Sequence, residues 1–353
     1  MTRTLLIMAG GTGGHVFPAL AVASHLRDKG WRVVWLGAKT GMEATLVPQH
    51  GYEMAWVRFS GLRGKGFASF ALLPLNLLIA FWQCAKAIFR IRPNVVLGMG
   101  GYVSFPGAMM ASLLNRPLVI HEQNAIAGLA NRTLAHVADR VLSGFPGVLK
   151  KAQWTGNPVR AEIQALPPPE QRYGLRQGPL RILVVGGSLG AQALNETVPQ
   201  SLSMIAQTQR PLVVHQAGKK HIDELRAAYA RAQVQGEAVD FIADMAKAYG
   251  ECDLVICRAG ALTCAELAAA GVASVLVPFP HAVDDHQTHN ARFLEKAGAA
   301  ILLPQPELAP KKLADLLMSF SREKLLGMAQ RARELARPQA TQDVAQVCEA
   351  LAA

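Results

Sequence analysis

The chain has 353 residues, which is too long for one ordinary hydrophobic core and suits two domains of typical size. Its formal net charge of +11 favours an anionic partner: nucleic acid, a phosphorylated metabolite or an acidic lipid surface. Because only 17% of the residues are charged and 51% are hydrophobic, a compact globular protein is favoured over one that coats nucleic acid.

The cysteines and the N-terminal residues indicate a cytoplasmic protein. The five cysteines show no CxxC spacing, which predicts reduced, mostly buried thiols and argues against a zinc site. The first apolar run begins within a few residues of Met1, so we expect no signal peptide.

The first half of the chain alternates predicted strands with predicted helices. Strands are expected at 4–9, 32–36, 94–98, 117–121 and 139–143. Helices are expected at 15–29, 41–50, 68–91, 105–114 and 127–137. This alternation predicts a doubly wound α/β domain, in which helices cover both faces of a parallel sheet.

The pattern breaks near 156–160 and at the prolines 167–169, which predicts a linker, and then restarts. Strands are expected at 180–185, 211–216, 239–242, 253–257 and 273–277, and final helices at 321–336 and 339–352. We therefore expect domains at 1–160 and 161–335, followed by a C-terminal helix at 336–353.

Two glycine-rich turns, at 10–14 and 186–190, each join a predicted strand to a predicted helix. Helix N-termini that follow such turns present free N–H groups and bind phosphates. Dinucleotide recognition fails on spacing, because Val16 stands where GxGxxG requires glycine and no acidic residue ends the strand at 32–36. A P-loop is excluded because GxxxxGK[ST] does not occur.

Polar and glycine residues also follow other predicted strands. They occur at 98–104, 121–124, 257–266 and 278–287. Because ligands of open parallel sheets bind at the carboxyl ends of the strands, we expect the active cleft there.

Several single residues have both a structural and a functional interpretation. His15 is either a packed imidazole or a general base that the helix N-terminus keeps neutral, and the functional interpretation is favoured. Thr12 and Ser188 suit helix N-caps as well as phosphate contacts. Glu266 suits a capping box with Thr263 or a bidentate acceptor for ribose hydroxyls.

Two further features also have a plain alternative. The run Asp284-Asp285-His286 invites a metal site, but we expect one aspartate to cap the following helix. The apolar stretch 67–89 contains Pro74, so a membrane-spanning helix is not expected. It is either a core helix or, with its flanking basic residues, a helix that lies on an anionic membrane. Those flanking residues are Arg58, Arg63, Lys65, Arg90 and Arg92.

Seven motifs occur in an order that resembles one family along essentially the whole chain. They are GGTGGH (10–15), GMGGYVS (98–104), HEQN (121–124), GNPVR (156–160), GGSLGA (186–191), CRAGALTCAE (257–266) and DDHQTHNA (284–291). The chain resembles the bacterial N-acetylglucosaminyltransferases of peptidoglycan synthesis, in glycosyltransferase family 28.

This resemblance implies a GT-B architecture, in which two Rossmann-like domains face each other across a cleft and the C-terminal helix returns to the first domain. It implies inverting, metal-independent transfer of N-acetylglucosamine from UDP-N-acetylglucosamine to the muramyl 4-hydroxyl of lipid I, giving lipid II. The first domain would take the acceptor and the second the donor, with no cofactor. The enzyme would sit peripherally on the cytoplasmic face of the inner membrane, with 67–89 docked on anionic lipid.

The resemblance also implies roles for particular residues. His15 would be the general base. The donor would contact Thr12, Gly13, Gly14, Asn124, Arg160, Ser188, Ile242, Ala261, Leu262, Thr263, Cys264, Ala265, Glu266 and Gln287. The acceptor diphosphate would contact Gly13, Gly14, Gly100, Gly101 and Tyr102.

Three residues depart from the commoner family pattern, namely Phe105, Ala259 and Ala265. Two other functions stay open. A UDP-N-acetylglucosamine 2-epimerase would need cleft carboxylates for proton abstraction and no acceptor site. A non-catalytic nucleotide-sugar-binding protein would keep Glu266 and Ser188 but have no use for a base at His15.

Overall fold

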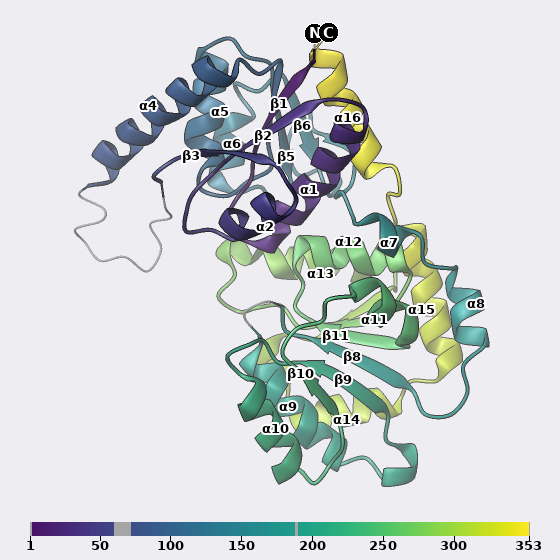
Figure 1. The fold of residues 1–353 in the computed structure, drawn as a ribbon. Helices are drawn as coiled ribbons and strands as arrows, with labels where there is room; N and C mark the ends of the chain where they lie inside the picture. Colours follow the sequence, from purple (N-terminus) through teal and green to yellow (C-terminus); the bar gives the residue numbers. More distant parts are fainter. Residues whose placement is uncertain (1, 60–71, 188–189, 353) are drawn as a thin grey trace. The chain divides into compact units, whose positions relative to one another are not determined.

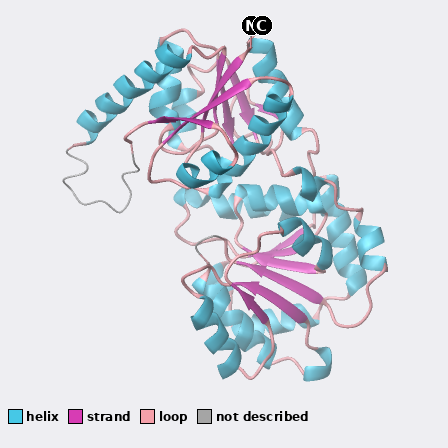
Figure 2. Ribbon diagram, in the orientation of Figure 1, coloured by secondary structure: helices cyan, strands magenta, loops and turns pink. Residues whose placement is uncertain are grey.

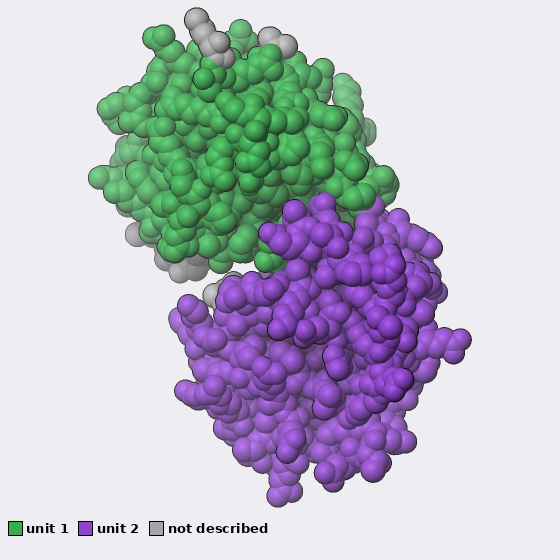
Figure 3. Space-filling view, turned by 45° about the vertical axis from the view of Figure 1, so that its right-hand side comes forward, with its two compact units in different colours: residues 1–160, 337–353 green, residues 161–336 purple. Residues whose placement is uncertain are grey.

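The computed structural model describes residues 2–59, 72–187 and 190–352 and divides into two compact units (Figures 1 and 3). Unit 1 comprises residues 1–160 and 337–353, and unit 2 comprises residues 161–336. The segment at 336–353 that was expected to form a terminal helix contains helix α16, Ala340–Leu351, which packs on the first helix of unit 1.

Unit 1 is built on a seven-stranded parallel sheet in the order β3-β2-β1-β4-β5-β6-β7. In Figure 2 the strands are magenta and the helices around them are cyan. Its strands are β1 Thr4–Met8, β2 Arg32–Gly37, β3 Glu53–Trp56, β4 Val95–Gly98, β5 Leu118–Glu122, β6 Arg140–Ser143 and β7 Gln153–Trp154. Its other helices are α1 Gly13–Asp28, α2 Glu43–Gln49, α4 Leu73–Ile91, α5 Ser104–Leu113 and α6 Leu129–Leu134.

Alternation along β1 gives this sheet two buried faces. Leu5 and Ile7 pack in a core with α1 and α16, whereas Leu6 and Met8 pack in a second core with α4 and α5. All four side chains are fully buried, as expected when successive residues of a strand point to opposite faces that are both covered by helices.

Unit 2 is built on a six-stranded parallel sheet in the order β10-β9-β8-β11-β12-β13. Its strands are β8 Arg181–Val185, β9 Leu212–Gln216, β10 Glu237–Val239, β11 Leu254–Cys257, β12 Ala273–Leu276 and β13 Ala300–Leu302. Its helices are α7 Ala161–Gln164, α8 Pro169–Gly174, α9 Gln192–Ser203, α10 Ile222–Arg231, α11 Met245–Glu251, α12 Ala261–Ala270, α13 His286–Lys296, α14 Pro310–Met318 and α15 Arg322–Glu334, with short 3₁₀ turns at Gln207–Gln209, Val283–Asp285 and Gln305–Glu307.

A buried ion cluster fixes the start of β8 and β11. The carboxylate of Asp253, which is fully buried, accepts hydrogen bonds from the Arg176 guanidinium and from the backbone N–H of Arg181, and Arg322 also contacts it. Burial acts to raise the pKa of Asp253, but these donors outweigh it and the pKa is lowered.

The α/β class and both parallel sheets were predicted correctly from the sequence. Each predicted strand is present, but the one expected at 239–242 lies at Glu237–Val239. Strands β3, β7 and β13 were missed, because they contain only four, two and three residues and so show little periodicity. All five cysteines are buried and free, as expected.

The apolar stretch predicted at 67–89 contains most of α4, Leu73–Ile91. Its residues 67–71 lie outside the described part of the chain. Among the described residues, no helix is both long and apolar enough to cross a membrane.

Candidate active site

The two glycine turns of unit 1 touch each other at the carboxyl ends of β1 and β4. The backbone N–H of Gly10 donates to the carbonyl of Gly100, with 3.3 Å between nitrogen and oxygen. Gly101 adopts a φ of +88°, and a Cβ there would overlap the backbone of Gly10. Only glycine fits this approach, since it tolerates positive φ and has no side chain.

A buried carboxylate, which sequence reasoning missed, holds the first of these turns. Glu43 accepts hydrogen bonds from the backbone N–H groups of Gly11, at 2.9 Å, and Ala38, at 3.1 Å. It is only 1% exposed and packs against Gly10 and Gly41. The N–H of Gly11 is therefore occupied, and the groups left for an anion are those at the start of α1.

Thr12 and His15 lie where the sequence predicted, at the beginning of α1. Thr12 is the N-cap residue, but its side chain makes no capping hydrogen bond. His15 is half-buried, and its Nδ1 lies 3.1 Å from Oε1 of Gln123. A Cβ on Gly100 would come within 2.5 Å of that Nδ1, so Gly100 provides the space in which the imidazole lies.

The residues that follow β5 form a dense network with the segment Gly156–Asn157. His121 Nε2 lies 2.9 Å from the carbonyl oxygen of Gly156, and the Asn157 amide donates to the carbonyl of Gln123 at 3.0 Å. His121 is fully buried, and burial lowers its pKa to about 4. The segment predicted as a linker therefore also supports the end of β5.

Glu122 organises the loop that contains Asn124. Its carboxylate accepts from the backbone N–H groups of Asn124 and Gly128, and from the Asn131 side chain at 2.9 Å. Glu122 is 4% exposed, and both its carboxylate oxygens accept hydrogen bonds from these donors, so its role in this unit is to shape the loop.

The remaining predicted residues of unit 1 lie on the same edge of the sheet. The Arg160 guanidinium stacks over the ring of Phe17, a residue of α1, at 5.5 Å from its centroid. Tyr102, which follows the second glycine turn, is 50% exposed. Phe105, one of the residues that depart from the family pattern, contacts Phe81 of α4, with 6.5 Å between the ring centroids and the ring planes tilted by 51°.

In unit 2, the predicted diphosphate turn is the N-terminus of α12. The helix begins at Ala261 after the N-cap residue Gly260. Of the two interpretations left open for Glu266, the capping box with Thr263 is therefore excluded, because Thr263 is already inside the helix. Glu266 is 5% exposed, and its Oε2 accepts from the hydroxyl of Tyr249 at 3.3 Å.

Gln287 and the two aspartates lie at the start of α13. Gln287 Oε1 accepts from the backbone N–H of Phe279 at 2.9 Å. Asp285 occupies the N-cap position expected for one of the aspartates, but its side chain makes no capping hydrogen bond. Its carboxylate accepts from the Thr288 hydroxyl instead. In the described ranges no three His, Cys, Asp or Glu side chains are grouped as metal ligands. Ser188 lies outside the described residues.

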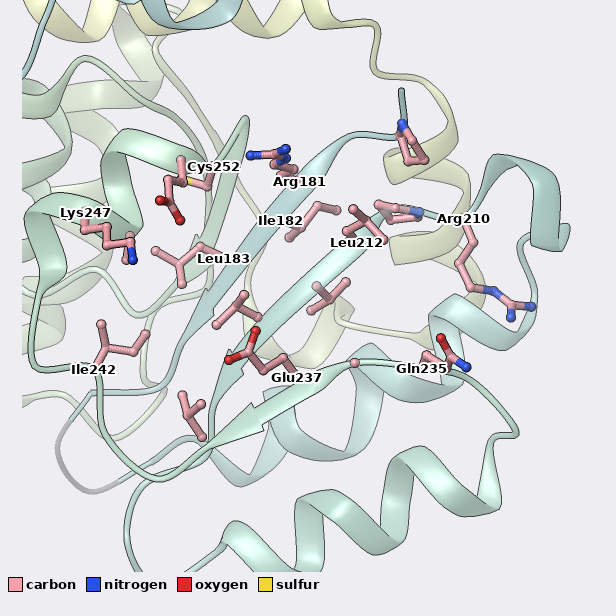
Figure 4. Close-up of a pocket in the computed structure, with 18 of the residues that line it drawn as sticks. Arg181, Ile182, Leu183, Arg210, Leu212, Gln235, Glu237, Ile242, Lys247 and Cys252 are labelled. Carbon is pink, nitrogen blue, oxygen red and sulfur yellow. The ribbon is translucent and has the colours of Figure 1, made fainter. Parts of the chain in front are cut away.

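Ile242 lies apart from these helix N-termini, in a groove along the face of β8, β9 and β10 (Figure 4). The groove has a volume of about 1310 Å³. Ile242 and Lys247 lie at one end of it, and Arg210 and Gln235 lie toward the other (Figure 4). Among the predicted donor residues that the structure describes, no other one lines this groove.

Two family models match most of the chain. The N-terminal domain model of glycosyltransferase family 28 matches residues 5–143, and the C-terminal domain model of the same family matches residues 181–347.

Full-length relatives extend the match. A protein of Aromatoleum aromaticum is 66% identical over 351 residues, covering 99% of this chain and 98% of its own. A protein of Dechloromonas aromatica is 63% identical over 352 residues, covering 100% of both. Each is named UDP-N-acetylglucosamine–N-acetylmuramyl-(pentapeptide) pyrophosphoryl-undecaprenol N-acetylglucosamine transferase.

A crystal structure also matches along the whole chain. Acinetobacter baumannii MurG is 41% identical, with a TM-score of 0.85, covering 99% of each chain. The chain therefore belongs to glycosyltransferase family 28, with the two Rossmann-like parallel sheets of the GT-B fold.

Proposed function

We propose that this chain transfers N-acetylglucosamine from UDP-N-acetylglucosamine to the muramyl 4-hydroxyl of lipid I, forming lipid II in peptidoglycan synthesis. The observation that carries this proposal is the 63–66% identity, over the full length, to relatives that all bear one name for this reaction. The reaction is a single displacement at the anomeric carbon, with inversion. The acceptor hydroxyl loses its proton to a base and UDP leaves.

His15 is the proposed base. It stands at the N-terminus of α1, beside the two glycine turns, where the backbone N–H groups of Gly13 and Gly14 have no partner within the helix. Those N–H groups, with Gly100, Gly101 and Tyr102, suit the acceptor diphosphate. The same helix end therefore holds the anion and presents the base, which brings the acceptor hydroxyl to His15.

The donor is assigned mainly to unit 2. The N-terminus of α12, Ala261–Ala265, and Ser188 would take its diphosphate, and Glu266 the ribose hydroxyls. The Tyr249 hydroxyl donates to one carboxylate oxygen of Glu266, Oε2. Ile242 would meet the uracil through its backbone. Thr12, Asn124, Arg160 and Gln287 would surround the sugar.

In this proposal the departing UDP is stabilised by helix N-termini and needs no metal ion. Positive partial charge at the start of α12 substitutes for a divalent cation. Removal of divalent metal with a chelator should therefore leave the rate unchanged.

Docking of α4 on an anionic membrane completes the proposal. Its outward face carries large apolar side chains, which are 56% to 65% exposed: Leu75, Leu78, Trp82 and Phe89. Their spacing places them on one side of the helix. Lys86 lies over the Trp82 ring, and Arg90 and Arg92 end the helix. Such a face suits a peripheral protein on the cytoplasmic side of the membrane. Arg63 and Lys65 lie outside the described residues.

The reaction is tested by incubating the chain with radiolabelled UDP-N-acetylglucosamine and a lipid I analogue, with and without chelator. We expect label in a disaccharide-lipid product and an equal amount of UDP. Release of UDP without labelled lipid would contradict the transfer. Label recovered as the 2-epimer of the sugar would identify an epimerase, and donor binding without turnover would identify a binding protein.

A further inference from the structure

Four groups form a continuous hydrogen-bonded chain that ends at His15. His15 Nδ1 lies 3.1 Å from Gln123 Oε1, and Gln123 Nε2 lies 3.2 Å from His121 Nδ1. His121 Nε2 lies 2.9 Å from the carbonyl oxygen of Gly156. Gln123 is 2% exposed and His121 is fully buried, so protein groups rather than bulk water decide how this chain is protonated.

Two backbone carbonyl groups, those of His121 and Gly156, determine which nitrogen atoms of this hydrogen-bonded network carry protons. The Gln123 amide nitrogen lies 3.2 Å from His121 Nδ1 and also 3.2 Å from the backbone carbonyl oxygen of His121. A carbonyl oxygen can only accept, so the group that faces it is the NH₂ of Gln123. The amide oxygen must then face His15, which requires a proton on His15 Nδ1.

The hydrogen bond between His121 and the Gly156 carbonyl leads to the same orientation of the Gln123 amide. Because the Gly156 carbonyl accepts, His121 carries its proton on Nε2, which leaves Nδ1 as an acceptor for the Gln123 NH₂. His121 then has one proton and is neutral, consistent with the lowering of its pKa by burial. In this arrangement, each donor of the network formed by His15, Gln123 and His121 faces an acceptor.

The surroundings hold this arrangement in place. The Asn157 amide donates to the backbone carbonyl of Gln123, which fixes the backbone from which the Gln123 side chain extends. Gly100, with a φ of +92°, leaves no space for a Cβ beside His15 Nδ1 or Gln123 Oε1, so the pair fits closely against the second glycine turn.

We propose that Gln123, itself oriented by His121, is a positioning residue that holds His15 as its Nδ1–H tautomer and so leaves Nε2 as the proton acceptor. This inference rests on the proposed function, in which His15 is the base. In the opposite tautomer the lone pair of Nδ1 would face the Gln123 oxygen, and two acceptors repel. As the base takes up a proton, the same oxygen continues to accept from Nδ1–H, which stabilises the imidazolium.

The test measures the tautomer and the kinetics in the full chain. In protein with ¹⁵N-labelled histidine, long-range proton–nitrogen correlation spectra distinguish Nδ1–H from Nε2–H, and the His15→Ala variant identifies the His15 signals among the ten histidines. We expect wild-type His15 to be protonated on Nδ1. In Gln123→Leu we expect the Nε2–H tautomer to appear and kcat to fall by about 10- to 100-fold, part of what a general base contributes. KM for the donor should be unchanged.

Two further variants separate positioning from loss of fold. Gln123→Glu keeps an acceptor for His15 Nδ1–H but replaces the NH₂ that faces His121 with an oxygen. It should therefore retain the Nδ1–H tautomer of His15 together with a second proton on His121 Nδ1, and its kcat should lie between those of wild type and Gln123→Leu. Gln330→Leu removes a surface amide that bonds Glu170, far from any site residue in sequence, and should match wild type in kcat and tautomer.

The inference is overturned if Gln123→Leu keeps the Nδ1–H tautomer and the wild-type kcat, or if Gln123→Glu loses both. It is also overturned if wild-type His15 is protonated on Nε2. Because the spectra need no substrate, they decide the tautomer even if wild type fails to transfer sugar, an outcome that would overturn the proposed function alone.

Discussion

The carboxylate of Glu43 accepts a hydrogen bond from the backbone N–H of Gly11, 2.9 Å away, and so joins the start of α2 to the first glycine turn. With its second oxygen on the N–H of Ala38, this side chain satisfies two backbone donors at once. Glu43→Ala should therefore destabilise the protein by about 3 kcal/mol, because buried donors are left unsatisfied. Urea denaturation measures this change.

A matched surface variant provides the comparison. Glu53 also pairs with a donor, Arg32 at 2.7 Å, but both side chains are 48% exposed. Glu53→Ala should cost less than about 1 kcal/mol, as exposed ion pairs do. Equal losses of unfolding free energy in the two variants would contradict the role given to Glu43.

Gly100→Ala should impair catalysis more than stability. The new methyl group would lie 2.5 Å from His15 Nδ1 and displace the imidazole, and a displacement of about 1 Å costs about 100-fold in rate. Gly51→Ala is the control, because Gly51 also has a positive φ, +77°, but nothing lies within 4 Å of the added Cβ. If kcat falls equally in both, backbone strain alone explains the loss.

The outward face of α4 should govern membrane binding. Replacing Leu78 and Trp82 together by glutamine removes two exposed apolar side chains, and should weaken binding to anionic lipid vesicles by about ten-fold or more. The melting temperature should stay near that of wild type, because neither side chain is buried. Leu175→Gln changes an apolar residue of unit 2 that is 86% exposed, and should bind vesicles as wild type does. Wild-type binding by the α4 variant would exclude this face.

Buried histidines should make the fold sensitive to mild acid. Burial lowers the pKa of His121 to about 4 and that of His215 to about 3, below the value of 6.5 for the unfolded chain. Between these values the unfolded chain binds more protons, so stability falls as the pH falls. Between pH 7 and pH 5, each of the two histidines should lower the protein's free energy of unfolding by about 2 kcal/mol.

His215→Phe tests this directly. His215 is fully buried between Asn195 and Tyr229 in unit 2. The variant should be less stable at pH 7, because two polar partners lose their hydrogen bonds, but its stability should depend less on pH. An unchanged slope of stability against pH between pH 7 and pH 5 would show that His215 does not contribute to this pH dependence.

Residues next to one another in the sequence predicted much of this structure, whereas contacts between distant residues were not predictable. The glycine turns, the alternation of strands and helices and the position of His15 at a helix start all follow from local pattern. The pairing of His15 with Gln123 joins residues 108 positions apart, and Gly11 and Glu43 are 32 apart. A single sequence carries no spacing rule for such pairs.

The capping box at Thr263 illustrates the limit in another way. Thr263 and Glu266 have the right spacing, but Gly260 takes the N-cap position because the chain leaves β11 through a turn that ends one residue before Ala261. The spacing alone therefore could not decide between the capping box and the other interpretation of Glu266, because the boundaries of helices are what sequence patterns specify least well.

The central claim is most directly tested by the rate at which the His15→Ala variant transfers labelled N-acetylglucosamine to a lipid I analogue, compared with wild type under saturating donor. The account predicts that wild type forms labelled lipid and that the variant, still folded and still binding UDP, is slower by about 10²- to 10⁴-fold. Undiminished transfer by the variant would contradict the assignment of the base, and the absence of labelled lipid with wild type would contradict the reaction itself.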